Sequence, residues 1–481
     1  MKRRVIASLL TLVLCLTLLP APAFAADTGE DTPEPAATDI YVSSTGNDDT
    51  GDGSEAKPYA TLAKAVCGAG SGATIYVMSN LTMTKCARYY DKDLTITSLD
   101  PNDPVTIFRG TEFDTQNDPR SWYNPALIEV QTKGEAERCG LILHHIILDD
   151  KGLHEGSIFA QASSGSGTDQ IDNTTIVQDA MIASNATVPC TITLGEGAIL
   201  RNFGGMSAVR VTESAKLVMK SGSKIEDTTV TDRIKGNVKG EVGPAGAVWV
   251  QNASVEMKAG SEISYVIGRA VYVDGGTVTM DGMISDIRSD THMWNACKGI
   301  ALHLRGGASA TFSGTIQNVK STDNDSYVVY DESSSIAFKS GSTIKNCSGT
   351  AKYGSLIYST GLTKEALLDG TITECHMPNN LIYSANSNFP TSIGPNAQIT
   401  NNSGSRLFYD NSVPDLQDAP AMTISGTITN NTLTDSMFVG SNDGREITIC
   451  DGAKINQNTL TSSTGSAIFW AGANRRIVME N

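Results

Sequence analysis

The chain has 481 residues and is acidic, with 52 Asp and Glu against 36 Lys and Arg and a formal net charge of −16. A surface of this sign repels nucleic acid and anionic lipid, so nucleic acid is excluded as a partner. It also suits polyanionic substrates poorly unless a metal ion or a local basic patch intervenes.

The first 25 residues have the form of a cleavable secretory signal. A basic stretch at 2–4 precedes an apolar run at 5–19, and Ala23-Phe24-Ala25 supplies the small residues of a cleavage site. The apolar run ends at Pro20 and is shorter than the about 18 residues of a membrane-spanning helix. We therefore expect an exported protein, extracellular or on the cell surface, with no transmembrane span after signal removal.

Farther along, an isoleucine recurs at a nearly constant interval. Successive spacings are 28, 28, 27, 29 and 27 residues, and the same feature recurs less regularly at Ile199, Ile225, Ile263 and Ile284. A fixed period of this size predicts a solenoid in which each coil buries its apolar face against the next. The regularly spaced members are Ile316, Ile344, Ile372, Ile399, Ile428 and Ile455.

Each coil also contains segments in which apolar and polar residues alternate, such as Val278-Thr279-Met280. Alternation with period two is typical of a strand with one buried face. No segment between residues 199 and 481 has a sustained helical period, which excludes a helical solenoid. The pattern predicts an all-β parallel β-helix with three strands and about 27–28 residues per coil.

An amide residue follows the repeated isoleucine by two positions in several coils. Asparagine tolerates the left-handed backbone conformation that a sharp turn requires. Stacked asparagines can also form hydrogen bonds along the coil axis as a ladder. We interpret these residues as structural corners: Asn318, Asn346, Asn401 and Asn430.

One position of the first strand carries an aromatic residue or histidine in most coils. Arg210 in an earlier coil and the valines beside Trp249 and Tyr272 predict that the early part of this column faces outward. In later coils a polar residue follows the tyrosine, so Tyr358 fits an outward or an inward orientation equally. An outward stripe could stack on sugar rings or simply cover strand surface. The candidate glycan-binding residues are Trp249, Tyr272, His303, Tyr330 and Tyr358.

A histidine- and aspartate-rich stretch is the best local candidate for catalysis, with His145, Asp149, Asp150 and His154 as its members. Strand alternation places His145 and Asp149 on one face and Asp150 on the other, whereas acid–base or metal chemistry needs convergent groups. A strand that ends in an acidic turn is the alternative interpretation.

Two further parts of the chain are candidate sites. Cys347 and Cys375 each follow a repeated isoleucine by three residues, which places them one coil apart. Neighbouring strands are about 4.8 Å apart, so either a disulfide or a pair of thiols fits.

The Asp-rich loop at 48–53 resembles the start of a calcium loop, but Tyr59 occupies the position of the bidentate glutamate. Calcium in an irregular geometry and a plain turn are both open; no other cofactor or metal is expected.

The N-terminal region has a recognisable resemblance. Residues 39–66, DIYVSSTGNDDTGDGSEAKPYATLAKAV, resemble the first segment of secreted right-handed parallel β-helix proteins of the pectate-lyase-like fold. The coil AVYVDGGTVTMDGMISD at 270–286 is similar to coils of Gram-positive, adhesin-like surface proteins. The resemblance implies a right-handed β-helix whose open end is capped by a short N-terminal helix. It does not choose a function, because this fold hosts lyases, hydrolases, epimerases, adhesins and stalks.

These observations lead to one layout and two functional hypotheses. The leading hypothesis is an adhesin-like or glycan-contacting scaffold without catalytic activity, with a glycan or cell-surface partner. The alternative is a polysaccharide lyase or glycoside hydrolase of the same fold acting on plant or host glycans. The last coil lacks its third strand, so we expect the β-helix to be incomplete there. The predicted segments are a signal peptide at 1–25, a disordered linker at 26–38, and a β-helix at 39–481 comprising a cap at 39–72, less regular coils at 73–200 and regular coils at 201–481.

Overall fold

The computed structural model describes most of the chain beyond residue 38. The described residues are 39–110, 113, 123–124, 126–134, 136–151, 177–178, 180–230, 245–289, 299–322, 327–332, 335–350, 354–360, 366–385, 390–411, 421–440, 446–462, 467–471 and 476–480. The predicted signal peptide, the predicted linker and His154 lie outside them. Within these ranges, no helix has the length and apolar character needed to span a membrane.

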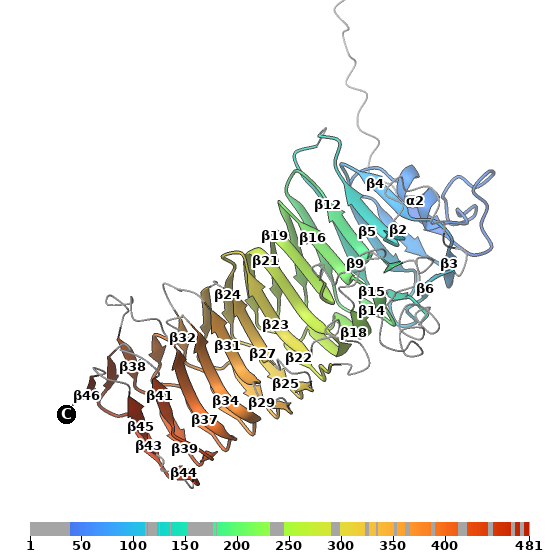
Figure 1. The fold of residues 1–481 in the computed structure, drawn as a ribbon. Helices are drawn as coiled ribbons and strands as arrows, with labels where there is room; N and C mark the ends of the chain where they lie inside the picture. Colours follow the sequence, from blue (N-terminus) through green and yellow to red (C-terminus); the bar gives the residue numbers. More distant parts are fainter. Residues whose placement is uncertain are drawn as a thin grey trace, which may run out of the picture. The chain divides into compact units, whose positions relative to one another are not determined.

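The described part of the chain is a stack of coils joined by parallel strand pairing (Figure 1). In one complete coil the strands are β23 (Ile300–Arg305), β24 (Ser309–Phe312) and β25 (Thr315–Gln317), followed by the short β26 (Lys320–Ser321). Each pairs in parallel with its counterpart in the next coil, as in Ile316 with Ile344. The predicted right-handed parallel β-helix is confirmed. The short strand after the corner is an addition to the three expected.

The strands form four ladders along the β-helix. The first contains β4 (Ala87–Tyr90), β8 (Ile128–Gln131), β12 (Ala180–Asn185), β16 (Ser207–Thr212), β19 (Val248–Met257), β21 (Arg269–Met280), β23, β27 (Tyr327–Glu332), β31 (Ser355–Thr360), β34 (His376–Ala385), β37 (Ser403–Asn411), β41 (Phe438–Gly440) and β45 (Phe469–Ala471). The second contains β1 (Ile40–Val42), β2 (Thr74–Val77), β5 (Asp93–Ser98), β9 (Cys139–His144), β13 (Cys190–Leu194), β17 (Ala215–Met219), the ends of β19 and β21, β24, β28 (Ser335–Phe338), β32 (Leu367–Leu368), β35 (Ser392–Ile393), β38 (Met422–Ile424), β42 (Ile447–Ile449) and β46 (Ile477–Met479).

The third ladder carries the repeated isoleucine. It contains β3 (Leu81–Met83), β6 (Thr106–Arg109), β10 (Ile147–Asp149), β14 (Ile199–Arg201), β18 (Lys224–Val230), β20 (Glu262–Ile267), β22 (Met283–Ser285), β25, β29 (Thr343–Lys345), β33 (Thr371–Thr373), β36 (Gln398–Thr400), β39 (Thr427–Thr429) and β43 (Lys454–Asn456). The short fourth strands are β15 (Gly204–Gly205), β26, β30 (Ser348–Gly349), the starts of β34 and β37, β40 (Thr432–Leu433) and β44 (Thr459–Leu460); β7 (Tyr123–Asn124) pairs separately with β11 (Val177–Gln178).

The repeated isoleucines lie in register and form the centre of the core. Ile316, Ile344 and Ile372 are each 0–1% exposed. One assignment from the sequence is wrong: Leu200, rather than Ile199, aligns with Ile225 and is buried. Both residues are apolar and adjacent, so only the strand register separates them.

A short helix, α2 (Leu62–Gly68), follows the first strand as the N-terminal segment predicts. Thr61 caps it by accepting a hydrogen bond from the Lys64 amide, and Asp48 accepts from the Thr61 amide and hydroxyl. Leu62, Ala65 and Val66 are buried in the same core as the coils. The loop acid Asp48 therefore acts as a helix-capping residue.

The corner after the third strand is left-handed in every coil from residue 202 onward for which it is described. The residue two positions after the core isoleucine has φ between 50° and 58° in each case. Asn346 donates to the side chain of Asn318 at 2.7 Å, as the predicted ladder requires. The corner residues are Asn202, Asp227, Tyr265, Asp286, Asn318, Asn346, Glu374, Asn401, Asn430 and Gln457.

A second, buried amide ladder lies one position farther on and was not predicted. Asn402 donates to the side chain of Asn431 at 3.0 Å, and Asn431 donates to that of Asn458 at 2.9 Å. Each also donates to a main-chain carbonyl of the preceding third strand, such as Ile399 for Asn431. This ladder satisfies backbone groups that would otherwise be buried without hydrogen bonds.

The buried asparagine ladder should contribute more to stability than the corner ladder, and substitutions at two adjacent residues test this. Asn431→Ala should lower the local stability of the last coils by roughly 3 kcal/mol, because it leaves buried donors and acceptors unsatisfied. Asn430→Gly should change it by less than about 0.5 kcal/mol, because glycine adopts the same positive φ. Native-state hydrogen exchange of amides in the last coils measures both. Equal losses would show that the buried ladder has no special role.

Candidate functional site

The predicted aromatic column is continuous along the first ladder. Direct register pairs join Arg210 to Trp249, Trp249 to Tyr272, and Tyr272 to His303. The same position continues through the next four coils as Tyr330, Tyr358, Tyr383 and Tyr409. We call the set from Trp249 to Tyr409 the aromatic column.

The column faces outward in the later coils as well as the early ones. Tyr358, Tyr383 and Tyr409 are partly exposed, whereas the polar residues that follow them point into the β-helix. These inward residues, Asp331, Ser359, Ser384 and Asp410, are all fully buried. Ser359 donates to Asp331 at 2.8 Å, so hydrogen bonding offsets the burial of the carboxylate. The inward orientation left open by the sequence is not observed.

The rings of the column contact one another along the axis. Centroids lie 4.8 Å apart for Tyr272 and His303, 4.7 Å for His303 and Tyr330, and 5.2 Å for the parallel rings of Tyr383 and Tyr409. Guanidinium groups lie over three of the rings: Arg210 over Trp249, Arg269 over Tyr272 and Arg406 over Tyr409. Ring faces are therefore largely occupied by neighbouring side chains, and the hydroxyls of Tyr272 and Tyr383 accept hydrogen bonds from Arg305 and Asn411.

Accessibility is uneven along the column. Trp249, Tyr330 and Tyr358 are partly exposed, but Tyr272 is only 4% and His303 only 6% exposed. The expectation of exposed rings at Tyr272 and His303 is corrected by this burial. Its physical cause is the charged cover supplied by Arg269 and Arg305 on the same face.

Charged groups gather around His303. Arg305 pairs with Asp274 at 3.6 Å and donates to the hydroxyl of Tyr272 at 3.4 Å. Glu332 Oε1 lies 3.8 Å from His303 Nε2. We call Arg269, Asp274, Arg305 and Glu332 the charged rim of the column. Sequence reasoning missed these residues because they occupy other strand positions, and only the register brings them beside His303.

The electrostatics of this cluster favour a neutral imidazole and an ionised carboxylate. Burial lowers the pKa of His303 to about 4, and the nearby Arg269 and Arg305 charges act in the same direction. The adjacent His303 ring and the Tyr330 hydroxyl hold the pKa of Glu332 down to about 2. Glu332 is therefore an acceptor at neutral pH rather than a proton donor.

The predicted catalytic stretch is divided between separate ion pairs. Asp149 is 4% exposed and accepts from Arg201 Nε at 2.7 Å and from Asn202. Asp150 is fully buried and accepts from Arg109 Nε at 2.5 Å. His145 stacks beside His144, with ring centroids 6.1 Å apart. The structure thus does not bring His145, Asp149 and Asp150 together; His154 lies outside the described residues.

The two cysteines of the predicted pair are buried thiols. Cys347 and Cys375 are free thiols, each 1% exposed, at the position that the buried asparagines occupy in later coils. A second thiol pair, Cys139 and Cys190, lies in direct register on the second ladder. In the described residues no group of three or more His, Cys, Asp or Glu is arranged to hold a metal ion.

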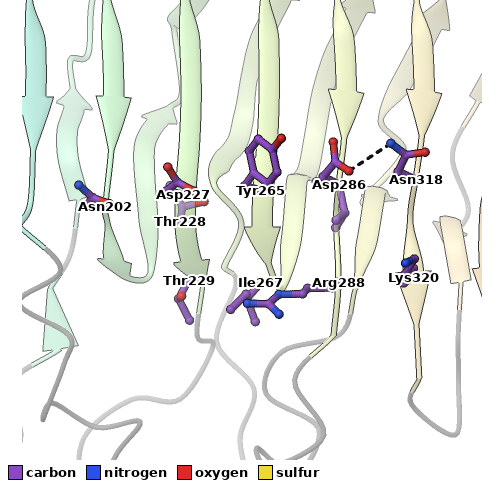
Figure 2. A pocket seen from close by; sticks show the side chains of 11 residues that line it. Asn202, Asp227, Thr228, Thr229, Tyr265, Ile267, Asp286, Arg288, Asn318 and Lys320 are labelled. Carbon is purple, nitrogen blue, oxygen red and sulfur yellow. Dashed lines mark hydrogen bonds between the residues drawn. The ribbon is translucent and has the colours of Figure 1, made fainter.

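A groove opens at the corners, away from the aromatic column (Figure 2). Its volume is about 460 Å³. Three successive corner residues, Asp227, Tyr265 and Asp286, stand side by side along it, and Arg288 and Lys320 occupy a second row two residues farther on. The remaining lining residues are Asn202, Thr228, Thr229, Ile267, Ile287 and Asn318. We call this the corner groove.

Tyr265 is the unusual residue of the corner groove. It is the one aromatic residue among the described corners, its φ is +54°, and it is 59% exposed. A bulky residue in the left-handed region costs on the order of 1–3 kcal/mol, and such strain concentrates at functional positions. The sequence held a signal here, since Tyr265 follows Ile263 where other coils carry an amide or acid.

Comparison with known proteins gives distant structural similarity only. No family model and no curated protein matches the chain. A GH136 lacto-N-biosidase from Eubacterium ramulus is 11% identical over 92% of this chain and 68% of its own, with a TM-score of 0.37. The tailspike of E. coli bacteriophage HK620, in complex with a pentasaccharide, is 9% identical over 85% and 72%, with a TM-score of 0.33. A family 28 exopolygalacturonase from Yersinia enterocolitica is 9% identical over 87% and 79%, with a TM-score of 0.31.

The buried His303 should make stability depend on pH. Its pKa is about 4 when folded and about 6.5 when unfolded, so the unfolded chain binds more protons between these values. Stability should therefore fall as the pH drops from 6.5 toward 4. Between pH 7 and pH 4.5 the wild-type protein should lose roughly 2.5 kcal/mol more unfolding free energy than His303→Gln. Urea unfolding at both pH values measures this difference.

An exposed histidine provides the control for this measurement. His376→Gln, on the surface of β34, should keep the pH dependence of the wild-type protein. The same pH dependence in His303→Gln and in the wild type would contradict the assigned burial of a neutral imidazole.

Proposed function

We propose that this β-helix is an exported, adhesin-like scaffold that contacts glycans through the aromatic column and its charged rim, without catalytic activity of its own. The observation that carries the proposal is the unbroken outward column from Trp249 to Tyr409. A protein stabilised only by its core has no need of large amphipathic side chains at one outward position in seven successive coils.

The chemistry of the column suits extended polar polymers with apolar patches. Tyrosine and tryptophan combine an apolar body with a polar tip, which suits sugars that expose both C–H and O–H groups. Since neighbouring rings occupy one another's faces, we infer contact through ring edges and hydroxyls rather than by a sugar stacked flat on one ring. Glu332, Asp274 and Arg305 add acceptors and donors beside the rings. The coil spacing of about 4.8 Å is close to the length of a sugar unit, so one polymer could meet several coils.

The electrostatics of the charged rim support binding rather than hydrolysis. A glycosidase needs one carboxylic acid with a raised pKa as its proton donor. Glu332 has a lowered pKa, and Asp274 is paired with Arg305. Glu332 therefore lacks the environment of a general acid.

Substitutions in the column test glycan contact directly. Tyr358→Ala and Trp249→Ala should each weaken binding to the best ligand of a glycan array by about tenfold, equal to 1.4 kcal/mol, because partly exposed rings are lost. Tyr265→Asn, an aromatic substitution in the corner groove, should leave that binding unchanged. Affinities unaffected by both column variants would remove the column as a binding surface. Release of reducing ends or unsaturated products from the bound glycan would contradict the non-catalytic part of the proposal.

Export is tested independently of binding. Residues 1–25 fused to a phosphatase that is active only outside the bacterial cytoplasm should give phosphatase activity, because the segment has basic, apolar and cleavage-site regions. Replacing two leucines in the apolar run, Leu12→Arg and Leu14→Arg, should abolish it. Full activity of that variant, or none from the unaltered segment, would contradict export.

A further inference from the structure

The corner groove holds four charged side chains, two of each sign. Asp227 and Asp286 lie on corners one coil before and one coil after Tyr265. Arg288 and Lys320 are exposed neighbours in the second row of the groove. None of the four makes an ion pair with any residue in the described ranges, and Asp286 only accepts a hydrogen bond from Asn318 at 3.1 Å. The chain has a net charge of −16, so an anionic group needs a local basic patch to bind. In the second row of the groove, Arg288 and Lys320 form such a patch because neither has an acidic partner in the described ranges.

The register fixes which of these residues are neighbours. The backbones of Asp227 and Asp286 lie about 4.8 Å on either side of that of Tyr265, since each is one coil away. Arg288 is two residues beyond the corner residue Asp286, in register with Lys320 of the next coil. The groove thus offers one row with two carboxylates and an aromatic ring, and beside it a second row with Ile267, Arg288 and Lys320.

The exposure of the corner aromatic residue also points to a ligand. Tyr265 contributes a ring that is 59% exposed, unlike the mutually covered rings of the aromatic column.

We propose that the corner groove binds a zwitterionic headgroup of the phosphocholine type, separate from the glycan contact at the aromatic column. The ammonium lies over the ring of Tyr265, between the carboxylates of Asp227 and Asp286, where cation–π and charge attraction act together. The phosphate lies at Arg288 and Lys320, and its several oxygens can accept from both cations at once. The inference does not depend on the glycan proposal, because the two surfaces share no residue.

The test is a calorimetric titration of the full chain with phosphocholine at low salt. Saturable binding is expected, and it should weaken as the NaCl concentration rises because both ends of the ligand are held by charge. Free choline and inorganic phosphate should each bind at least tenfold more weakly than phosphocholine. Glycine betaine should also bind more weakly, since its carboxylate is too close to the ammonium to reach Arg288. No binding of phosphocholine, or equal binding of its separate parts, would overturn the proposal.

Variants assign the binding to the groove. Tyr265→Asn should weaken phosphocholine binding about fivefold, while restoring the amide that other corners use and so preserving the fold. Arg288→Gln and Asp286→Asn should each weaken it at least tenfold. The matched control is Glu374→Gln, a corner outside the groove, which should bind within twofold of the wild type. Tyr358→Ala should also bind normally. Binding that is unchanged in Tyr265→Asn and Arg288→Gln would place the ligand elsewhere and refute the assignment.

Vesicles distinguish the source of the headgroup. Co-sedimentation with phosphatidylcholine vesicles, competed by soluble phosphocholine, would identify a lipid surface as the source. Binding of soluble phosphocholine without co-sedimentation would identify a headgroup carried by another molecule. Both results support the zwitterion chemistry, whereas co-sedimentation that soluble phosphocholine does not compete would contradict it.

Discussion

The parallel backbone hydrogen bonds between successive coils are the constraint on which the rest of the structure depends. They hold equivalent strands about 4.8 Å apart, so every side chain lies directly above its counterpart in the coil before. A residue type that recurs in the repeat therefore becomes a continuous column in space. The isoleucine core, the asparagine corners and the aromatic column are three columns produced by one set of hydrogen bonds.

The same constraint determines how a charged side chain at an inward position can be stabilised. An inward charged residue must find its partner in a neighbouring coil, and Asp331 does so through Ser359 directly above it. Arg109 and Asp150 solve the problem as an ion pair between neighbouring coils of the third ladder, with both side chains at most 1% exposed. An outward position is freer even where neighbouring side chains cover it, so His303 can interrupt a run of tyrosines, although its burial depresses its pKa. Variation is thus concentrated on the outward positions, where ligands can be recognised.

Much of this arrangement could be predicted from the sequence, because the spacing of the repeat shows which residues align in neighbouring coils. The core isoleucines, the left-handed corners and the aromatic column follow from spacing alone, and the structure has all three. Orientation in the later coils could not be settled, since Tyr358 is followed by a serine that looks solvent-exposed in the sequence and is fully buried in the fold. Interactions between different columns were also inaccessible: Glu332 meets His303 only because β27 lies beside β23, and spacing says nothing about lateral neighbours.

The corner columns show how one scaffold separates stability from recognition. The position three residues after the core isoleucine points inward and carries Cys347, Cys375, Asn402 and Asn431. The cysteines of the earlier coils pack in the core, whereas the asparagines of the later coils form hydrogen bonds, and the backbone is the same in both. The position before it points outward and requires only a positive φ, which Asn, Asp, Glu and Gln all satisfy. Because the backbone there is already held by the inner column, the outer residue can change at low risk to the fold. Tyr265 is the corner residue that the need for a positive φ does not explain, since an asparagine there would relieve the backbone strain. A side chain that destabilises its own corner, stands exposed, and lies between two carboxylates is best accounted for by what it binds rather than by what it supports.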